Sequence, residues 1–157
     1  MEQIILVNEN DEEAGVMEKM EAHEKGLLHR AFSVFIFNTD GQMLLQQRAA
    51  RKYHSPKLWT NACCSHPRPN EITLNAAQRR LNEELGFETV LEKVFEFTYK
   101  TAFDNGLTEY EFDHVYTGIY EGIITPDPNE VQDYCYTSMH DIQESLQSHP
   151  HKYTIWF

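Results

Sequence analysis

The 157-residue sequence is short of positive charge, of cysteine and of long apolar runs. It holds 13 Lys and Arg against 25 Asp and Glu, so its formal net charge is −12. This acidity argues against nucleic acid or an anionic membrane as a partner. Three cysteines with no Cys-x-x-Cys pair form neither a disulfide framework nor a zinc ribbon. No stretch reaches bilayer-spanning length, and the N-terminus lacks the features of a signal peptide, so no membrane insertion is expected.

What is present has the composition of a globular protein. Hydrophobic residues make up 41% of the chain and charged residues 24%. The length fits one domain over residues 1–157 with one core, and no repeat or linker divides it. We therefore expect a single cytoplasmic domain, monomeric or homodimeric.

Apolar and aromatic runs predict strands at residues 4–7, 31–37, 43–47, 94–103, 107–120 and 131–136. Turn residues at Asp40-Gly41 and Asn105-Gly106 predict two hairpins. In the run 94–103, aromatic and polar residues alternate, which predicts a half-buried strand. With helices at about 74–85 and 139–146, the second capped by Ser138, the order predicts an α+β fold. We expect an α/β/α sandwich with a mixed β-sheet flanked by helices.

The helix at 74–85 is amphipathic. Apolar residues recur at spacings of three and four and form one stripe for burial: Leu74, Ala77, Leu81 and Leu85. Thr73 or Asn70 is expected to cap its start, and Gly86 to end it. Charged residues should occupy the other face, each arginine one turn before a glutamate: Arg79, Arg80, Glu83 and Glu84. An ordinary surface helix with ion pairs is the alternative to a functional role.

Two other stretches have the residue types of a site. Glu109, Glu111 and Asp113 share one face of the strand 107–120, where they either face water or supply hard oxygen ligands to a metal. The basic segment 48–52 either serves solubility on an exposed edge or clamps a diphosphate.

The pattern around this helix resembles the Nudix box, and the match is carried by Ser65, Glu71, Arg79, Leu81, Glu83, Glu84, Gly86 and Phe87. Arg80 stands where the box has its first helical glutamate, which hydrolases use to hold metal, so hydrolysis is disfavoured. The preceding segments 59–61 and 64–67, Trp-Thr-Asn and Cys-Ser-His-Pro, resemble type I isopentenyl diphosphate isomerase of the Nudix superfamily. The resemblance extends from Ile4 to Trp156 and implies the Nudix fold.

The resemblance also implies a metal centre. One octahedral divalent ion, zinc, manganese or magnesium, would be held by His23, His29, His66, Glu109 and Glu111. Its nitrogen-rich donors favour transition metals. A second ion, magnesium, would join Glu84 to the substrate diphosphate. The diphosphate would contact Arg48, Lys52 and Arg80, and no flavin is expected.

The implied reaction interconverts isopentenyl diphosphate and dimethylallyl diphosphate by protonation and deprotonation through a carbocation. Cys64 and Glu111 would stand on opposite sides of the hydrocarbon, and which of them gives the proton stays open. Tyr99 would relay or hold a proton, and the π-face of Trp156 would stabilise the cation. Family members usually carry further chain after this tryptophan, so either the pocket closes differently here or the tail is truncated.

Two other functions are alternatives: a Nudix hydrolase of a nucleoside diphosphate derivative, and a non-catalytic metal-dependent binding module. The hydrolase leaves Arg80, Cys64 and the histidines unexplained. Cys63 and Cys135 are interpreted as packed thiols. No role is assigned to His54, His114, His140, His149 or His151.

Overall fold

The computed structural model describes residues 2–52, 54–154 and 157. Its strands are β1 (Gln3–Val7), β2 (Glu13–Glu18), β3 (His29–Phe37), β4 (Met43–Arg48), β5 (Trp59–Thr60), β6 (Cys63–Ser65), β7 (Glu92–Ala102), β8 (Thr108–Ile119) and β9 (Val131–Thr137). Its helices are α1 (Lys19–Lys25), α2 (Thr73–Leu85), α3 (Met139–Ser148) and a short 3₁₀ helix, η1 (Pro150–Lys152). No helix among the described residues is long and apolar enough to cross a membrane.

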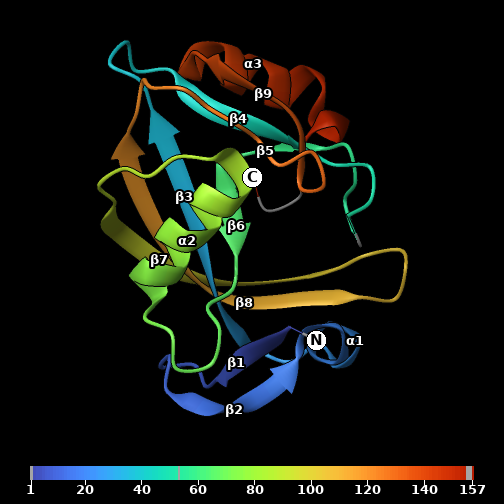
Figure 1. Ribbon diagram of the computed structural model, residues 1–157. Coiled ribbons are helices and arrows are strands. Elements are labelled where there is room, and N and C mark those ends of the chain that lie inside the picture. The colour runs from blue at the N-terminus through green and yellow to red at the C-terminus, as the bar shows by residue number, and fades with distance from the viewer. Residues whose placement is uncertain (1, 53, 155–156) are drawn as a thin grey trace.

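The sheet is mixed and is organised around β3 (Figure 1). β3 pairs in parallel with β8 along its whole length and antiparallel with β1 and β6. The predicted hairpin at Asp40-Gly41 forms, but its strands pair only at Phe37 and Met43. Beyond that point β3 and β4 diverge, and β4 pairs with β9 instead. The divergence leaves room for β6 beside β3.

The two long helices cover opposite faces of the sheet, so the predicted α/β/α sandwich is confirmed. Along β3 and β4, side chains alternate between the faces. Ile36 and Leu44 belong to the core under α2, whereas Phe35 and Leu45 pack with Ile142 of α3. Figure 1 shows α2 in front of β3, and α3 beside β4 and β9.

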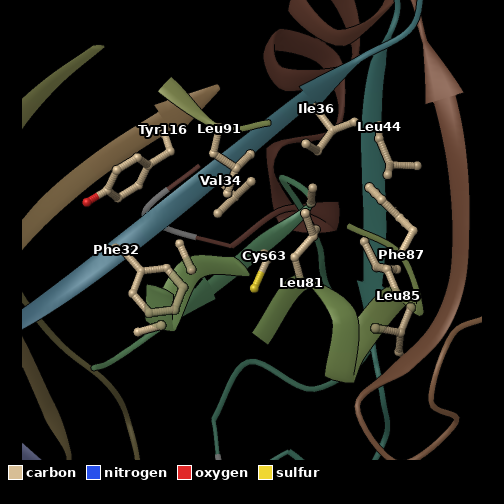
Figure 2. Close-up of a cluster of buried hydrophobic side chains, with 14 residues drawn as sticks. Phe32, Val34, Ile36, Leu44, Cys63, Leu81, Leu85, Phe87, Leu91 and Tyr116 are labelled. Atoms are coloured by element: carbon tan, nitrogen blue, oxygen red, sulfur yellow. The ribbon is translucent and has the colours of Figure 1, made fainter. Parts of the chain in front are cut away.

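The α2 stripe is buried as the sequence predicts. Leu81 and Leu85 are fully buried against β3 (Figure 2). Ala77 is fully buried as well, and Leu74 packs at the margin of the same cluster. Burying each leucine side chain contributes about 1.5–3 kcal/mol. Gly86 ends the helix in the left-handed conformation, with φ 73°. This packing fixes α2 against β3 and β6, next to the segment that holds Cys64.

Several expectations about helix ends and burial are wrong. Neither Thr73 nor Asn70 caps α2, because its N-cap is Ile72, which makes no side-chain bond. Glu84 is buried, because it lies on the edge of α2 that faces β4, where Gln46 donates a hydrogen bond to it. Cys135 is exposed because it lies on the uncovered part of β9.

β7 is not half-buried. It is an edge strand that pairs only with β8, and Phe95 and Phe97 are 55% and 39% exposed. Alternation predicted that one face is apolar, but the described chain provides no element to cover it. The sequence also gave no sign of β2 and α1, because residues 13–25 are polar and both elements are short.

Candidate active site

The predicted metal ligands converge where α1, β3, β6 and β8 meet. His29 at the start of β3 lies beside Glu111 in the parallel register with β8. α1 brings His23, and the chain leaving β6 brings His66. One ligand atom from each of these four residues lies within 4.8 Å of the others, and all four side chains are buried. His29 and Glu111 are 82 residues apart in sequence, yet they belong to one cluster.

Backbone carbonyls orient two of the imidazoles. His23 Nδ1 lies 2.7 Å from the carbonyl oxygen of Lys19, and His29 Nδ1 lies 2.9 Å from that of Leu27. A carbonyl only accepts, so each Nδ1 carries the proton and Nε2 is the nitrogen with a lone pair. His66 Nε2 and His29 Nε2 lie 3.0 and 3.3 Å from Glu111 Oε2. Carbonyl support of this kind is what metal-binding histidines have in proteins.

The electrostatics suit a cation. Burial opposes ionisation of Glu111, but the neighbouring imidazoles of His29 and His66 outweigh it and hold its pKa well below the ordinary value. Burial, and then the neighbouring charge of His66, lowers the pKa of His23 to about 4. The cluster at neutral pH therefore offers a carboxylate and a neutral imidazole, the protonation states that bind metals.

Glu109 lies beside this cluster, with His23 and with His54, a histidine to which the sequence analysis assigned no role. One ligand atom from each of the three lies within 4.8 Å of the others. Burial, and then repulsion from Glu111, raises the pKa of Glu109 well above its ordinary value. Its Oε2 is buried without a hydrogen-bond partner among the described residues. A buried, partnerless carboxylate oxygen is expensive, and a metal ion would satisfy it. The residues therefore fit a divalent cation.

Cys64 lines one pocket together with Glu109 and Glu111, and polar neighbours hold its thiol. Its thiol donates to Asn61 Oδ1 at 3.1 Å and lies 3.5 Å from Ser33 Oγ, which itself donates to Asp113. Burial, and then the charge of Asp113, raises the pKa of the Cys64 thiol far above its ordinary value. The thiol is thus neutral and has a proton to give.

Asn61 has one possible orientation. Its Nδ2 lies 2.9 Å from the carbonyl oxygen of Val34 and 3.1 Å from that of Cys63, so this nitrogen donates twice. The other amide atom must be the oxygen, and it faces Cys64. Sequence reasoning assigned no role to Asn61, Ser33 or Asp113. The only available signal was the place of Asn61 in the Trp-Thr-Asn segment.

Tyr99 contacts the same carboxyl group as the histidines. Its hydroxyl donates to Glu111 Oε1, while Glu111 Oε2 faces the histidines. Burial, and then the charge of Glu111, raises the pKa of Tyr99 far above its ordinary value, so the phenol keeps its proton. Cys64, Tyr99 and Glu111 line one pocket. Trp156, the fourth predicted catalytic residue, lies outside the described residues.

The predicted diphosphate ligands line this pocket as well: Arg48, Lys52 and Arg80. Arg80 and Lys52 both form ion pairs with Glu130, a pocket residue that the sequence did not single out. Arg48 donates to the carbonyl oxygen of His54 at 3.3 Å.

Glu84 is not among the clustered ligand groups. Its Oε2 accepts from Arg80 and from the Cys63 thiol, at 3.1 and 3.2 Å. Cys63 is a fully buried thiol, as predicted. The proposed second ion would have to compete with Arg80 for this carboxylate.

Comparison with known proteins agrees with this geometry. The NUDIX domain pattern matches residues 27–157. The chain is 51% identical to the isopentenyl-diphosphate Delta-isomerase of Pectobacterium atrosepticum, over 99% of this chain and 87% of that protein. It is 48% identical to the protein of the same name from Serratia proteamaculans, with the same coverage of both chains. This chain belongs to the isopentenyl-diphosphate Delta-isomerase family.

Solved structures show the Nudix fold more widely. A crystal structure from Deinococcus radiodurans matches with a TM-score of 0.78 at 20% identity, over 94% of this chain and 90% of that one. A MutT protein from Methanosarcina mazei matches with a TM-score of 0.65 at 17% identity, over 74% and 81%. The isomerase family thus shares its fold with proteins whose sequences have diverged widely.

Proposed function

We propose that this chain interconverts isopentenyl diphosphate and dimethylallyl diphosphate. The observation that carries the proposal is one pocket with a neutral thiol, Cys64, and a carboxylate bonded to a phenol, Glu111 with Tyr99. Moving a carbon–carbon double bond by protons needs two such groups in one site closed to water. The relatives that match nearly the whole chain are named for this activity.

The reaction adds one proton and removes another. A proton adds to the terminal alkene carbon, the π electrons form the new C–H bond, and a tertiary carbocation results. Loss of a proton from the carbon on the other side of the cationic centre returns its C–H electrons as the new double bond. Cys64 and Glu111 are the two groups we assign to these transfers. Tyr99 holds the Glu111 carboxyl in place from one side.

We assign a divalent metal to His23, His29, His66, Glu109 and Glu111. Bound there, the ion supplies positive charge beside the Glu111 carboxylate and fixes its position. Zinc and manganese suit three imidazoles better than magnesium does. Magnesium with the substrate at Glu84, and a cation–π role for Trp156, remain part of the proposal through the family resemblance.

The diphosphate binds at Arg48, Lys52 and Arg80 in this proposal. The protein carries a net charge of −12, so a local group of cations is needed to hold an anion. Arg80 also stands at the place of a metal-binding glutamate in the Nudix box. A cation there binds phosphate oxygens and leaves one carboxylate fewer for hydrolysis.

Proton exchange in D₂O tests the activity. The metal-loaded protein is incubated with isopentenyl diphosphate beside Cys64→Ala, Glu111→Gln and the control Cys135→Ala, whose side chain is exposed. NMR should show deuterated dimethylallyl diphosphate with the wild type and the control, and none with the two pocket variants. Unlabelled, unconverted substrate with the wild type would refute the isomerase. Release of inorganic phosphate would identify a hydrolase instead.

A further inference from the structure

β7 is open along its free edge and on both faces. Among the described residues it pairs only with β8, and all of its residues except Tyr99 and Thr101 are exposed. It is 11 residues long. A strand edge carries unpaired N–H and C=O groups that another strand can join, and proteins usually keep such edges short or covered. β7 is therefore suited to receive a further strand.

One face of β7 carries an aromatic stripe. The rings of Phe95, Phe97 and Tyr99 follow one another with centroids 5.9 and 5.7 Å apart. Tyr99 donates to Glu111, so this is the face on which the pocket lies. Phe95 and Phe97 are largely open to solvent. Covering an exposed aromatic stripe removes apolar surface from water, which is favourable.

The other face of β7 carries one acid and one base. Glu96 and Lys100 lie two positions to either side of Thr98, on the face opposite to the aromatic stripe. Side chains directly opposite each other on antiparallel strands point to the same face. If a second copy of β7 pairs antiparallel about Thr98, Glu96 therefore lies opposite Lys100 of that copy. By symmetry, Lys100 lies opposite the Glu96 of that copy.

The same axis suits the rest of the strand. β7 has a bulge at its N-terminal end, next to Phe95, and its register is regular beyond it. An axis at Thr98 pairs residues 95–101 with their copies and leaves the bulge outside. It also sets Phe97 opposite Tyr99 of the second copy, and aromatic pairs in this position are stabilising.

Neighbouring registers do not match the charges. An axis one residue to either side of Thr98 sets Glu96 or Lys100 opposite Thr98 and forms no ion pair. An axis two residues away sets Glu96 opposite Glu96, or Lys100 opposite Lys100, and like charges directly opposite each other are destabilising. Of these axes, the one at Thr98 alone brings opposite charges together.

We propose that β7 is the interface of a homodimer, in which two copies of the chain pair antiparallel about Thr98 and join their sheets. The pattern fits a second copy of this chain, because a two-fold axis makes each strand supply the acid for the other strand's base. Phe97 of the second copy then packs against Tyr99, beside the pocket.

Charge reversal tests the ion pairs. Sedimentation velocity at micromolar to millimolar concentration compares the wild type with Glu96→Lys, Lys100→Glu, the double variant and the control Glu144→Lys, which makes the same charge change on the exposed side of α3. The wild type and the control should dimerise, and each single variant should raise the dissociation constant of the dimer about tenfold or more. The double variant should dimerise again, because both ion pairs return with their charges exchanged. A mixture of the two single variants should form heterodimers, because each supplies the charge that the other has lost.

Crosslinking tests the position of the axis. In a Cys135→Ser background, which removes the exposed thiol, Thr98→Cys should form a disulfide-linked dimer under mild oxidation. Residues directly opposite each other on antiparallel strands have Cα atoms about 4.5–5.5 Å apart, within the range of a disulfide. Thr101→Cys is the control, because its two copies would lie about 20 Å apart along the strands and should not crosslink.

Several results would overturn the interface. They are a wild type that stays monomeric at every concentration, a dimer that is indifferent to both charge reversals, and single variants that do not associate with each other. Crosslinking through Thr101→Cys in place of Thr98→Cys would overturn the register. The interface does not depend on the isomerase activity, so none of these results bears on the proposed function.

Discussion

Replacing Gly86 by alanine should destabilise the protein by about 1.5–3.5 kcal/mol. Gly86 ends α2 at φ 73°, where a Cβ costs about 1–2 kcal/mol. That Cβ would also lie 2.5 Å from the carbonyl oxygen of Thr125, closer than a real contact allows. Backbone must therefore move. Thr125 N donates to the carbonyl oxygen of Leu85 at 2.9 Å, and losing that bond adds about 0.5–1.5 kcal/mol.

Gly41→Ala is the matched control. Gly41 has nearly the same backbone, φ 77°, but a Cβ there meets nothing within 4 Å. It should cost only the conformational part, about 1–2 kcal/mol. Urea unfolding of both variants, monitored by circular dichroism, gives their free energies of unfolding when the slope m against urea concentration is the same for both. If Gly86→Ala were no more than about 0.5 kcal/mol worse than Gly41→Ala, the steric part of the reasoning would be refuted.

Three further predictions concern the core, the pH dependence of stability and the thiol. Leu81→Ala should lower the free energy of unfolding by about 2–5 kcal/mol in urea, since Leu81 is fully buried under β3; a loss below 1 kcal/mol would contradict the described packing. Glu71 accepts two hydrogen bonds from Arg79, which lower its pKa below 4.5, so Glu71→Gln should be less stable than the wild type at pH 7, and the difference should shrink as pH falls through the lowered pKa. A constant difference from pH 7 to pH 3 would show that the ion pair is not its source. Asn61→Ala should reduce kcat about tenfold or more, because the Cys64 thiol loses its hydrogen-bond acceptor. KM should change little, because the cations assigned to the diphosphate are untouched. A tenfold rise in KM with kcat unchanged would instead assign Asn61 to substrate binding.

Local patterns in the sequence were enough for most of the secondary structure. The α2 stripe, its glycine end and the alternating strands follow from periods of 3.6 and 2, which depend only on residues near one another in the chain. The same reasoning was wrong where burial depends on a partner. Phe95 and Phe97 are exposed because β7 is an edge strand, and no residue in β7 itself records that.

The site illustrates the same division. The family resemblance predicted His23, His29, His66 and Glu111 as ligands, but their spacing in sequence could not show that they meet. The parallel register of β3 with β8, and the position of α1, bring them within 4.8 Å. His54 had no motif to mark it. Only the tertiary structure placed its Nε2 3.7 Å from Glu109, because a loop has no periodicity that predicts where its side chains point.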